Sequence, residues 1–596
     1  MDFDPVPFDV LRGLLHWLLV LASVSAVALV IATLVSIGTM GLSGPGFILG
    51  QLGRTLKHFA LALSGSGLRR VSTIAGLTLK EAVRRKALWI FAIFALLFMF
   101  AGWFLSGEIA GTSDVAKPYI TFVLTVINGL SLPLAILLAC WGLPQDIKDR
   151  SLHTVVTKPV RRVEIVMGRM LGYSLVTIIV VGIMSAIGYL WIKRTVPDYA
   201  QDELIGRVPI RGELVIIGRD GQPGGGVNVG DIWERRRFVD GNSQARGIYT
   251  FDDLPLGRLR DAGRLRLEYD FEVFRTYKGD IETGVLAQFA FVNDRGTEDE
   301  SDDLIVRYPD VPFEVKEFTT SVEDAVESVP AELLGPSGDT VELFKVGDEQ
   351  LVAEIGEARA RRAVLLENGD EDEAAKVVVP SDGLIAPDGS LTVSVRCVDD
   401  QQYLGLAQTD LFIRLPDRSF AVSYFKAALG IMLQAILLVI IGTTASCVVK
   451  GPVATFLTLG IFVMGLSDTR EYVSNELFAE VDARNVTPGD DTILGGGPIE
   501  SVYRLVTGVN QSTALADTSA VNTMQAIDKG LLGMMRLTFE VVPDLRPFNT
   551  LAYLQSGFDI PWNSSILPSL ATTLAFLIPC IVLGALCLQL RELEAK

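Results

Sequence analysis

Seven long apolar blocks constrain this chain more than any other feature of its sequence. A helix needs about 20 apolar residues to cross the hydrocarbon core of a bilayer, because each residue advances the helix by about 1.5 Å. The blocks that reach or approach this length are 14–40, 87–105, 118–141, 171–192, 427–449, 452–466 and 566–590, of which the sixth is the shortest. The pattern predicts an α-helical polytopic membrane protein with about seven transmembrane helices.

The first block is predicted to be a transmembrane helix and not a signal peptide. Its apolar run exceeds the roughly 7 to 15 residues of a signal-peptide core. Asp2, Asp4 and Asp9 also stand where a signal peptide carries basic residues.

The basic residues between the blocks predict the orientation, because short cytoplasmic loops accumulate Lys and Arg. Segment 42–86 carries eight basic residues and a single acidic one, Glu81, and segment 142–170 carries six basic residues. Both segments are therefore predicted to be cytoplasmic. Alternation then places the N-terminus and the segments 193–420 and 468–565 outside, and the C-terminus in the cytoplasm.

Segment 193–420 differs from the rest of the chain in charge and in pattern. It contains 46 Asp and Glu residues against 26 Lys and Arg residues, a net charge of −20, whereas the whole chain carries −18. The acidity therefore belongs to this segment, and nothing in the charge points to nucleic-acid binding. Apolar and charged residues alternate in 265–273 and again in 391–397, as in half-buried strands. The segment is predicted to be an inserted β-rich, sandwich-like extracytoplasmic domain.

These features divide the chain into seven parts. The predicted parts are an N-terminal transmembrane helix (1–41), interfacial amphipathic helices (42–86), transmembrane helices two to four with a loop at 142–170 (87–192), the acidic β-rich domain (193–420), transmembrane helices five and six (421–467), a second outside segment (468–565) and the seventh transmembrane helix with a cytoplasmic tail (566–596). Within 42–86, the second amphipathic helix is predicted to start near Ser72 or Thr73 and to end at Arg84, Arg85 and Lys86.

Several kinds of site are disfavoured by residue type. No apolar block has an ionisable residue well inside it, which argues against an ion-coupled transporter, and Lys426 at the start of the fifth block is expected to extend to the membrane surface. The three histidines, His16, His58 and His153, all lie outside the β-rich domain, which excludes a His-ligated zinc site or a His-dependent catalytic triad there. No catalytic residue and no metal site is predicted.

The cytoplasmic loop between the third and fourth blocks carries the most informative motif, GLPQDIKDRSLHTVVTKPVRRVEIVMGRMLG, from Gly142 to Gly172. It is short and charged, is broken by Pro144 and Pro159, and leads directly into an apolar block. Here the sequence resembles the ABC-2 type transporter permeases. The positions that match the motif of that family are Asp146, Asp149, Arg150, Ser151, Leu152, Lys158, Pro159, Val160 and Arg161, followed by Gly168 and Arg169 before the next helix. The positions that match the interfacial helix of that family are Lys80, Glu81, Arg84, Arg85 and Lys86.

Two positions depart from the family pattern. Arg169 stands where a Lys is usual, and Arg150 stands where a Gly is common. The resemblance covers the second to the seventh block, with the first block and the β-rich domain as additions.

The resemblance implies a permease subunit of a bacterial inner (plasma) membrane exporter. A separate cytoplasmic ABC ATPase subunit, which holds ATP and Mg²⁺, would dock on the 142–170 loop and drive a dimer of this chain with a second permease copy or a paralogue. This chain has no Gly-Lys pair and therefore no phosphate-binding loop of that type, so it is expected not to be an enzyme and to carry no cofactor. The sequence does not specify the transported substrate. The alternative is a membrane-anchored extracytoplasmic binding or sensory protein.

Overall fold

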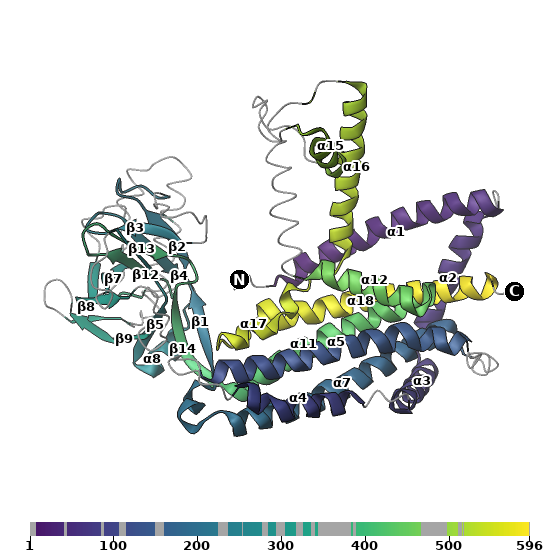
Figure 1. Ribbon diagram of the computed structural model, residues 1–596, viewed down its shortest axis with the longest axis horizontal. Helices are drawn as coiled ribbons and strands as arrows, with labels where there is room; N and C mark the ends of the chain where they lie inside the picture. The colour runs from purple at the N-terminus through teal and green to yellow at the C-terminus, as the bar shows by residue number, and fades with distance from the viewer. Residues whose placement is uncertain are drawn as a thin grey trace.

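A computed structural model describes most of the chain and separates a helical body from a β-rich domain (Figure 1). The described residues are 8–40, 44–84, 89–105, 115–148, 160–224, 236–252, 254–276, 284–293, 304–316, 326–334, 340–343, 361, 383–385, 389–466, 497–509, 515 and 518–594.

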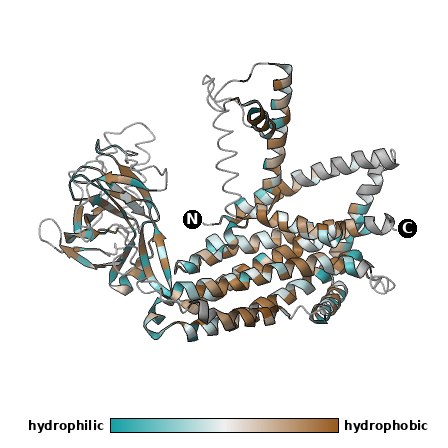
Figure 2. Ribbon diagram, in the orientation of Figure 1, coloured by the Kyte–Doolittle hydropathy of each residue, from teal (hydrophilic) through white to brown (hydrophobic). Residues whose placement is uncertain are grey.

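Four helices in the described residues are long and apolar enough to cross a membrane. They are α5 (Ala116–Lys148), α7 (Arg162–Thr195), α11 (Phe420–Val448) and α18 (Leu567–Glu594), the last preceded by the π-helical turn η6 (Trp562–Ile566). They run side by side, and their brown colouring in Figure 2 marks their apolar composition. In the most apolar stretch of α11, 83% of the residues are buried, against 22% in the corresponding stretch of the span Trp562–Gln589. The helix α11 is therefore the central helix of the body.

The other helices outside the β-rich domain lie beside this core or, like α15 and α16, extend away from it (Figure 1). They are α1 (Val10–Met40), α2 (Gly44–Ala62), α3 (Gly65–Arg84), α4 (Trp89–Leu105), α12 (Gly451–Gly465), α15 (Pro498–Thr507), α16 (Ser519–Val541), η5 (Arg546–Phe548) and α17 (Thr550–Gln555). At 15 residues, α12 is only about 22 Å long, shorter than the roughly 30 Å of a bilayer core. The amphipathic helix α3 begins at Gly65, seven residues before Ser72, and the carbonyl of the preceding Ser64 accepts a hydrogen bond from the Leu68 N–H at 2.9 Å.

The β-rich domain contains two larger antiparallel sheets and two smaller ones. The strands are β1 (Ile205–Arg211), β2 (Glu213–Ile217), β3 (Arg237–Asp240), β4 (Arg246–Phe251), β5 (Arg264–Tyr269), β6 (Glu272–Arg275), β7 (Val285–Asn293), β8 (Leu304–Val315), β9 (Val326–Pro330), β10 (Glu332–Leu334), β11 (Thr340–Glu342), β12 (Leu391–Cys397), β13 (Gln402–Leu406) and β14 (Leu411–Ser419). The sheet orders are β2-β4-β12-β7-β8, β1-β14-β5-β9, β3-β13-β6 and β10-β11. The short helix η2 (Asp198–Glu203) precedes the domain, and α8 (Leu256–Ala262) lies within it.

A single core of buried apolar side chains from several sheets holds the domain together. The predicted strand at 391–397 is confirmed as β12. The run 265–273 forms two strands, β5 and β6, which pair in different sheets. Period-two alternation continues through both strands because both place their apolar residues in the same core.

The β-rich domain and the crosswise helix α3 lie at opposite ends of the helical body (Figure 1). The β-rich domain joins the end where α7 finishes and α11 begins, since β1 follows α7 and β14 leads directly into α11. At the other end, α5 finishes at Lys148 and α7 begins at Arg162, and α3 lies crosswise beside them.

The segment between α16 and α18 packs against the helical body. Leu545 and Phe548 are buried against Leu433, Leu437 and Ile441 of α11. Thr550 Oγ1 donates a hydrogen bond to the Ala427 carbonyl, 3.0 Å away. This part of the predicted outside segment therefore packs against the central helix before α18 begins.

Candidate functional site

The segment between α5 and α7 is shorter than the predicted 142–170 loop. Residues 142–148 continue α5, and residues 162–170 belong to α7. Six of the predicted loop residues lie outside the described residues, as do two of the predicted basic residues that follow α3. These are Asp149, Arg150, Ser151, Leu152, Lys158, Pro159, Arg85 and Lys86. Asp146 lies in the last turn of α5.

The structure brings three of the predicted residues, Glu81, Gly168 and Arg169, together where α3 crosses the first turns of α7. We call this contact the α3–α7 junction; its residues are Arg70, Ile74, Thr78 and Glu81 of α3, and Glu164, Gly168, Arg169 and Gly172 of α7. Val160 and Arg161 lead into it, and both are half-buried. Glu81 from one predicted motif and Gly168 and Arg169 from the other thus belong to one contact.

Two glycines one helical turn apart allow the helices to approach closely. A Cβ on Gly168 would lie 2.6 Å from the Cβ of Ile74, and a Cβ on Gly172 would lie 2.5 Å from the Cβ of Thr78. Both distances are shorter than any carbon–carbon contact between packed side chains. The sequence Gly-x-x-x-Gly is the small-residue spacing that lets two helices cross at short distance.

Glu164 closes one end of this seam with a buried ion pair. Its side chain is fully buried, and Arg70 donates to both of its oxygens, from Nε at 2.9 Å and from Nη2 at 2.7 Å. The backbone N–H of Arg161 donates to Glu164 Oε2 at 3.0 Å. A carboxylate in the first turn of a helix also offsets the positive end of the helix dipole. Glu164 therefore fixes the start of α7 and ties it to α3.

Arg169 closes the other end of the seam. Its Nη1 lies 2.6 Å from Glu81 Oε2 and 3.3 Å from Thr78 Oγ1, both on α3. Lys80 and Arg84 are both exposed. The junction is therefore held by apolar packing between two ion pairs.

The charges of the junction alter two neighbouring groups. The hydrogen bond from Arg70 to Glu164 raises the pKa of the Arg70 guanidinium. Burial lowers the pKa of His58 on α2, and the positive charges of Arg161 and Arg162 lower it further. The neutral form of His58 is thus favoured beside the start of α7.

A second polar contact joins the β-rich domain to the helical body. We call it the Asp559 junction; its residues are Arg207, Arg418, Ser423, Lys426 and Asp559. Both carboxylate oxygens of Asp559 accept hydrogen bonds from Lys426 Nζ at 2.8 Å, and Oδ1 also accepts one from Ser423 Oγ at 2.8 Å. Arg418 Nη1 lies 3.2 Å from Oδ2, and the backbone N–H of Asp559 donates to the Arg207 carbonyl at 2.7 Å. Asp559 therefore connects β14 and α11 through its carboxylate and β1 through its backbone N–H.

The expectation for Lys426 is wrong. Its side chain is only 4% exposed, and its ammonium group also donates to the Ile560 carbonyl at 2.9 Å. The lysine does not extend to the membrane surface because Asp559 neutralises its charge inside the protein.

Sequence reasoning missed Glu164, Arg70 and Asp559 as partners. In the sequence, Glu164 is one charge among many in a basic loop. Arg161 directly precedes α7, and an acidic residue three positions later is typical of the first turn of a helix. Asp559 and Lys426 are 133 residues apart, and their only shared sequence signal is that each lies close to the start of an apolar block.

Comparisons with known protein families, with curated proteins and with solved structures found no match for this chain.

Proposed function

We propose that this chain is the permease subunit of an ABC-2 type transporter, and that a separate cytoplasmic ATPase docks where α5 ends and α7 begins. The proposal gives the protein the orientation expected from its basic residues. The end bearing α3 is then cytoplasmic, and the β-rich domain is extracytoplasmic.

The α3–α7 junction is the observation that carries the proposal. A partner that pushes on the segment between α5 and α7 moves the membrane-spanning helices only if the start of α7 is rigid. The glycine seam and the two ion pairs supply that rigidity, and they extend it to the crosswise helix α3. The α7 helix in turn packs against α5 and α11, so a displacement at its start reaches the central helix.

The transport cycle assigned to this site needs no chemistry from the chain itself. ATP and Mg²⁺ would bind to the partner ATPase, and this chain would convert closure of the ATPase into a movement of its helices. A second permease copy or a paralogue would complete the transport path. Export is the direction that the family resemblance implies.

Co-purification tests the proposal. The tagged full-length chain, expressed in its native host and extracted in mild detergent, is expected to retain an ABC ATPase and ATP hydrolysis activity. The triple variant Asp149→Ala, Leu152→Ala, Lys158→Ala is expected to lose both, since it removes charge and apolar contact from the docking segment.

A matched control removes basic residues from the same end of the body. The variant Arg54→Ala, Lys57→Ala changes two exposed residues of α2 and is expected to retain the ATPase. Equal ATPase retention by the triple variant would show that the docking role is wrong.

One observation favours the alternative of an extracytoplasmic binding or sensory protein. A polar pocket of about 380 Å³ in the β-rich domain is lined by residues that include Arg219, Asp240, Asn242 and Tyr403. Asp240 is buried, and its Oδ1 has no hydrogen-bond partner among the described residues. A specific ligand for this pocket, together with failure of every ATPase to co-purify, would favour this alternative over the permease.

A further inference from the structure

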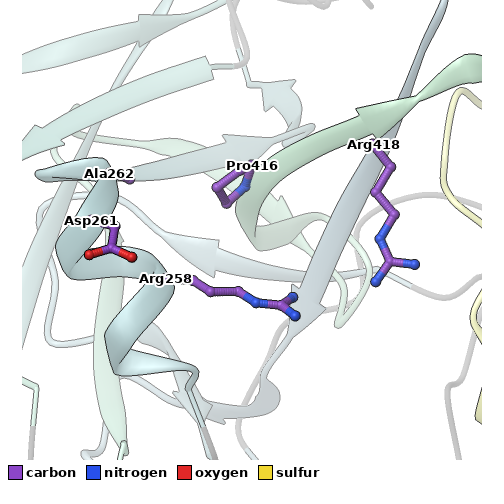
Figure 3. A pocket seen from close by; sticks show the side chains of 5 residues that line it. All are labelled: Arg258, Asp261, Ala262, Pro416 and Arg418. Carbon is purple, nitrogen blue, oxygen red and sulfur yellow. The ribbon is translucent and has the colours of Figure 1, made fainter.

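A second pocket lies on the part of the β-rich domain that leads into the membrane helices. It has a volume of about 470 Å³ and lies between α8 and β14, with Arg258, Asp261 and Ala262 on one side and Pro416 and Arg418 on the other. Figure 3 shows the guanidinium groups of Arg258 and Arg418 extending toward the same opening, while the Asp261 carboxylate lies apart from them.

Both arginines have hydrogen-bond donors to offer a ligand. Arg258 is exposed and has no ion-pair partner within the described part of the chain. Arg418 is 40% exposed and contacts Asp559 through Nη1. Since a guanidinium has five N–H donors, the contact with Asp559 leaves most donors of Arg418 for a ligand. Two guanidinium groups facing one opening match the oxygen atoms of a phosphate.

The charge of this pocket is opposite to that of the domain around it. Segment 193–420 has 46 acidic residues against 26 basic ones, so most of its surface repels anions. The pocket has two arginines and one aspartate among its lining residues, a net charge of +1. A local positive charge in an acidic domain indicates that the ligand is an anion.

The position of the pocket favours a lipid over a soluble anion. Arg418 lies two residues before Phe420, the first residue of the candidate membrane span α11. Exposed aromatic side chains lie at the same end of the spans, including Tyr199 after α7, Phe425 on α11 and Trp562 before α18. Aromatic residues of this kind collect at the level of the lipid headgroups.

We propose that the pocket between α8 and β14 binds the phosphate of an anionic phospholipid headgroup. Arg258 and Arg418 hold the phosphate oxygens, and the acyl chains start beside Val422 and Phe425, which are exposed at the beginning of α11. The lipid fixes the acidic domain against the membrane surface that would otherwise repel it. This site is separate from the α3–α7 junction and does not depend on the ATPase.

Lipid retention by the full-length protein tests the proposal. The chain is reconstituted in phosphatidylcholine nanodiscs with a minor fraction of phosphatidylglycerol, and native mass spectrometry measures the lipids that remain bound after extraction. The wild type is expected to enrich phosphatidylglycerol. The double variant Arg258→Gln, Arg418→Gln is expected to lower the enrichment about tenfold or more, since each arginine near a membrane surface contributes about fivefold in affinity.

Two further variants separate the site from general charge and from misfolding. Arg258→Lys, Arg418→Lys retains the charge but not the paired geometry, and is expected to retain part of the enrichment. Arg237→Gln, Arg307→Gln removes two exposed arginines of β3 and β8, away from α8, and is expected to behave as the wild type.

Three results would overturn the proposal. The first is equal enrichment in the wild type and in the Gln double variant. The second is an equal loss in the β3 and β8 control, which would mean that only the total charge matters. The third is displacement of phosphatidylglycerol by millimolar inorganic phosphate, which would identify a soluble anion as the ligand.

Discussion

The two ends of the helical body use the same kind of contact in different surroundings. At the α3–α7 junction, Glu164 is fully buried but its partner Arg70 is 31% exposed. At the Asp559 junction, the partner Lys426 is only 4% exposed. Water therefore solvates part of the first ion pair and almost none of the second. Loss of one charged partner should therefore destabilise the Asp559 junction more than the α3–α7 junction. The α3–α7 junction depends more on the close packing of two glycines.

Removing one member of the buried pair is expected to have the largest effect. Asp559→Ala leaves the Lys426 ammonium buried without its counter-charge, and this should lower the free energy of unfolding by about 3–5 kcal/mol. Denaturant unfolding of the purified protein in lipid-detergent micelles measures the change. Lys426→Met should cost a similar amount, because it leaves the Asp559 carboxylate without its main donor.

The double variant Asp559→Leu, Lys426→Met provides the control. It removes both charges, so it should be more stable than either single variant. If the losses of unfolding free energy in the two single variants simply add in the double variant, an unpaired buried charge is not their cause. The difference drawn between the two junctions would then be wrong.

The sequence predicts the elements of this fold better than the contacts between them. The length of the apolar blocks predicts α5, α7, α11 and α18, and alternation predicts β12, because both signals are local. The Asp559 junction depends on residues from β1, β14, α11 and the segment before α18, whose approach only the tertiary fold determines. For the same reason, Gly168 and Gly172 signal a close helix contact but do not identify α3 as the partner.

Filling the glycine seam is expected to have the next largest effect. Gly172→Ala places a methyl group against Thr78 of α3, so the two helices must separate, at a cost of about 1–3 kcal/mol in unfolding free energy. Gly182→Ala lies on the same helix in open space and should cost nothing. Equal stability of the two variants in the same unfolding assay would mean that close packing does not hold α3 to α7.

The ion pair at the other end of the seam should contribute less. Glu81 is 31% exposed and Arg169 is 14% exposed, so water solvates much of the pair, and Glu81→Gln should cost about 0.2–1 kcal/mol. A double-mutant cycle with Arg169→Gln isolates the pair, and the coupling energy should fall as salt is added. Coupling as large as that of Asp559 with Lys426 would remove the distinction between the two junctions.

Acidification should weaken the contact between α2 and the start of α7, where His58 lies. Burial and the charges of Arg161 and Arg162 hold the pKa of His58 below its usual value, so the unfolded chain takes up this proton first as the pH falls. The stabilisation from neutral His58 is therefore complete above about pH 6.5 and declines below it. Melting temperatures at pH 7.5 and pH 5.5 should differ more in the wild type than in His58→Gln, and Arg162→Gln should fall between them. An unchanged pH dependence in His58→Gln would assign the acid sensitivity to groups other than His58.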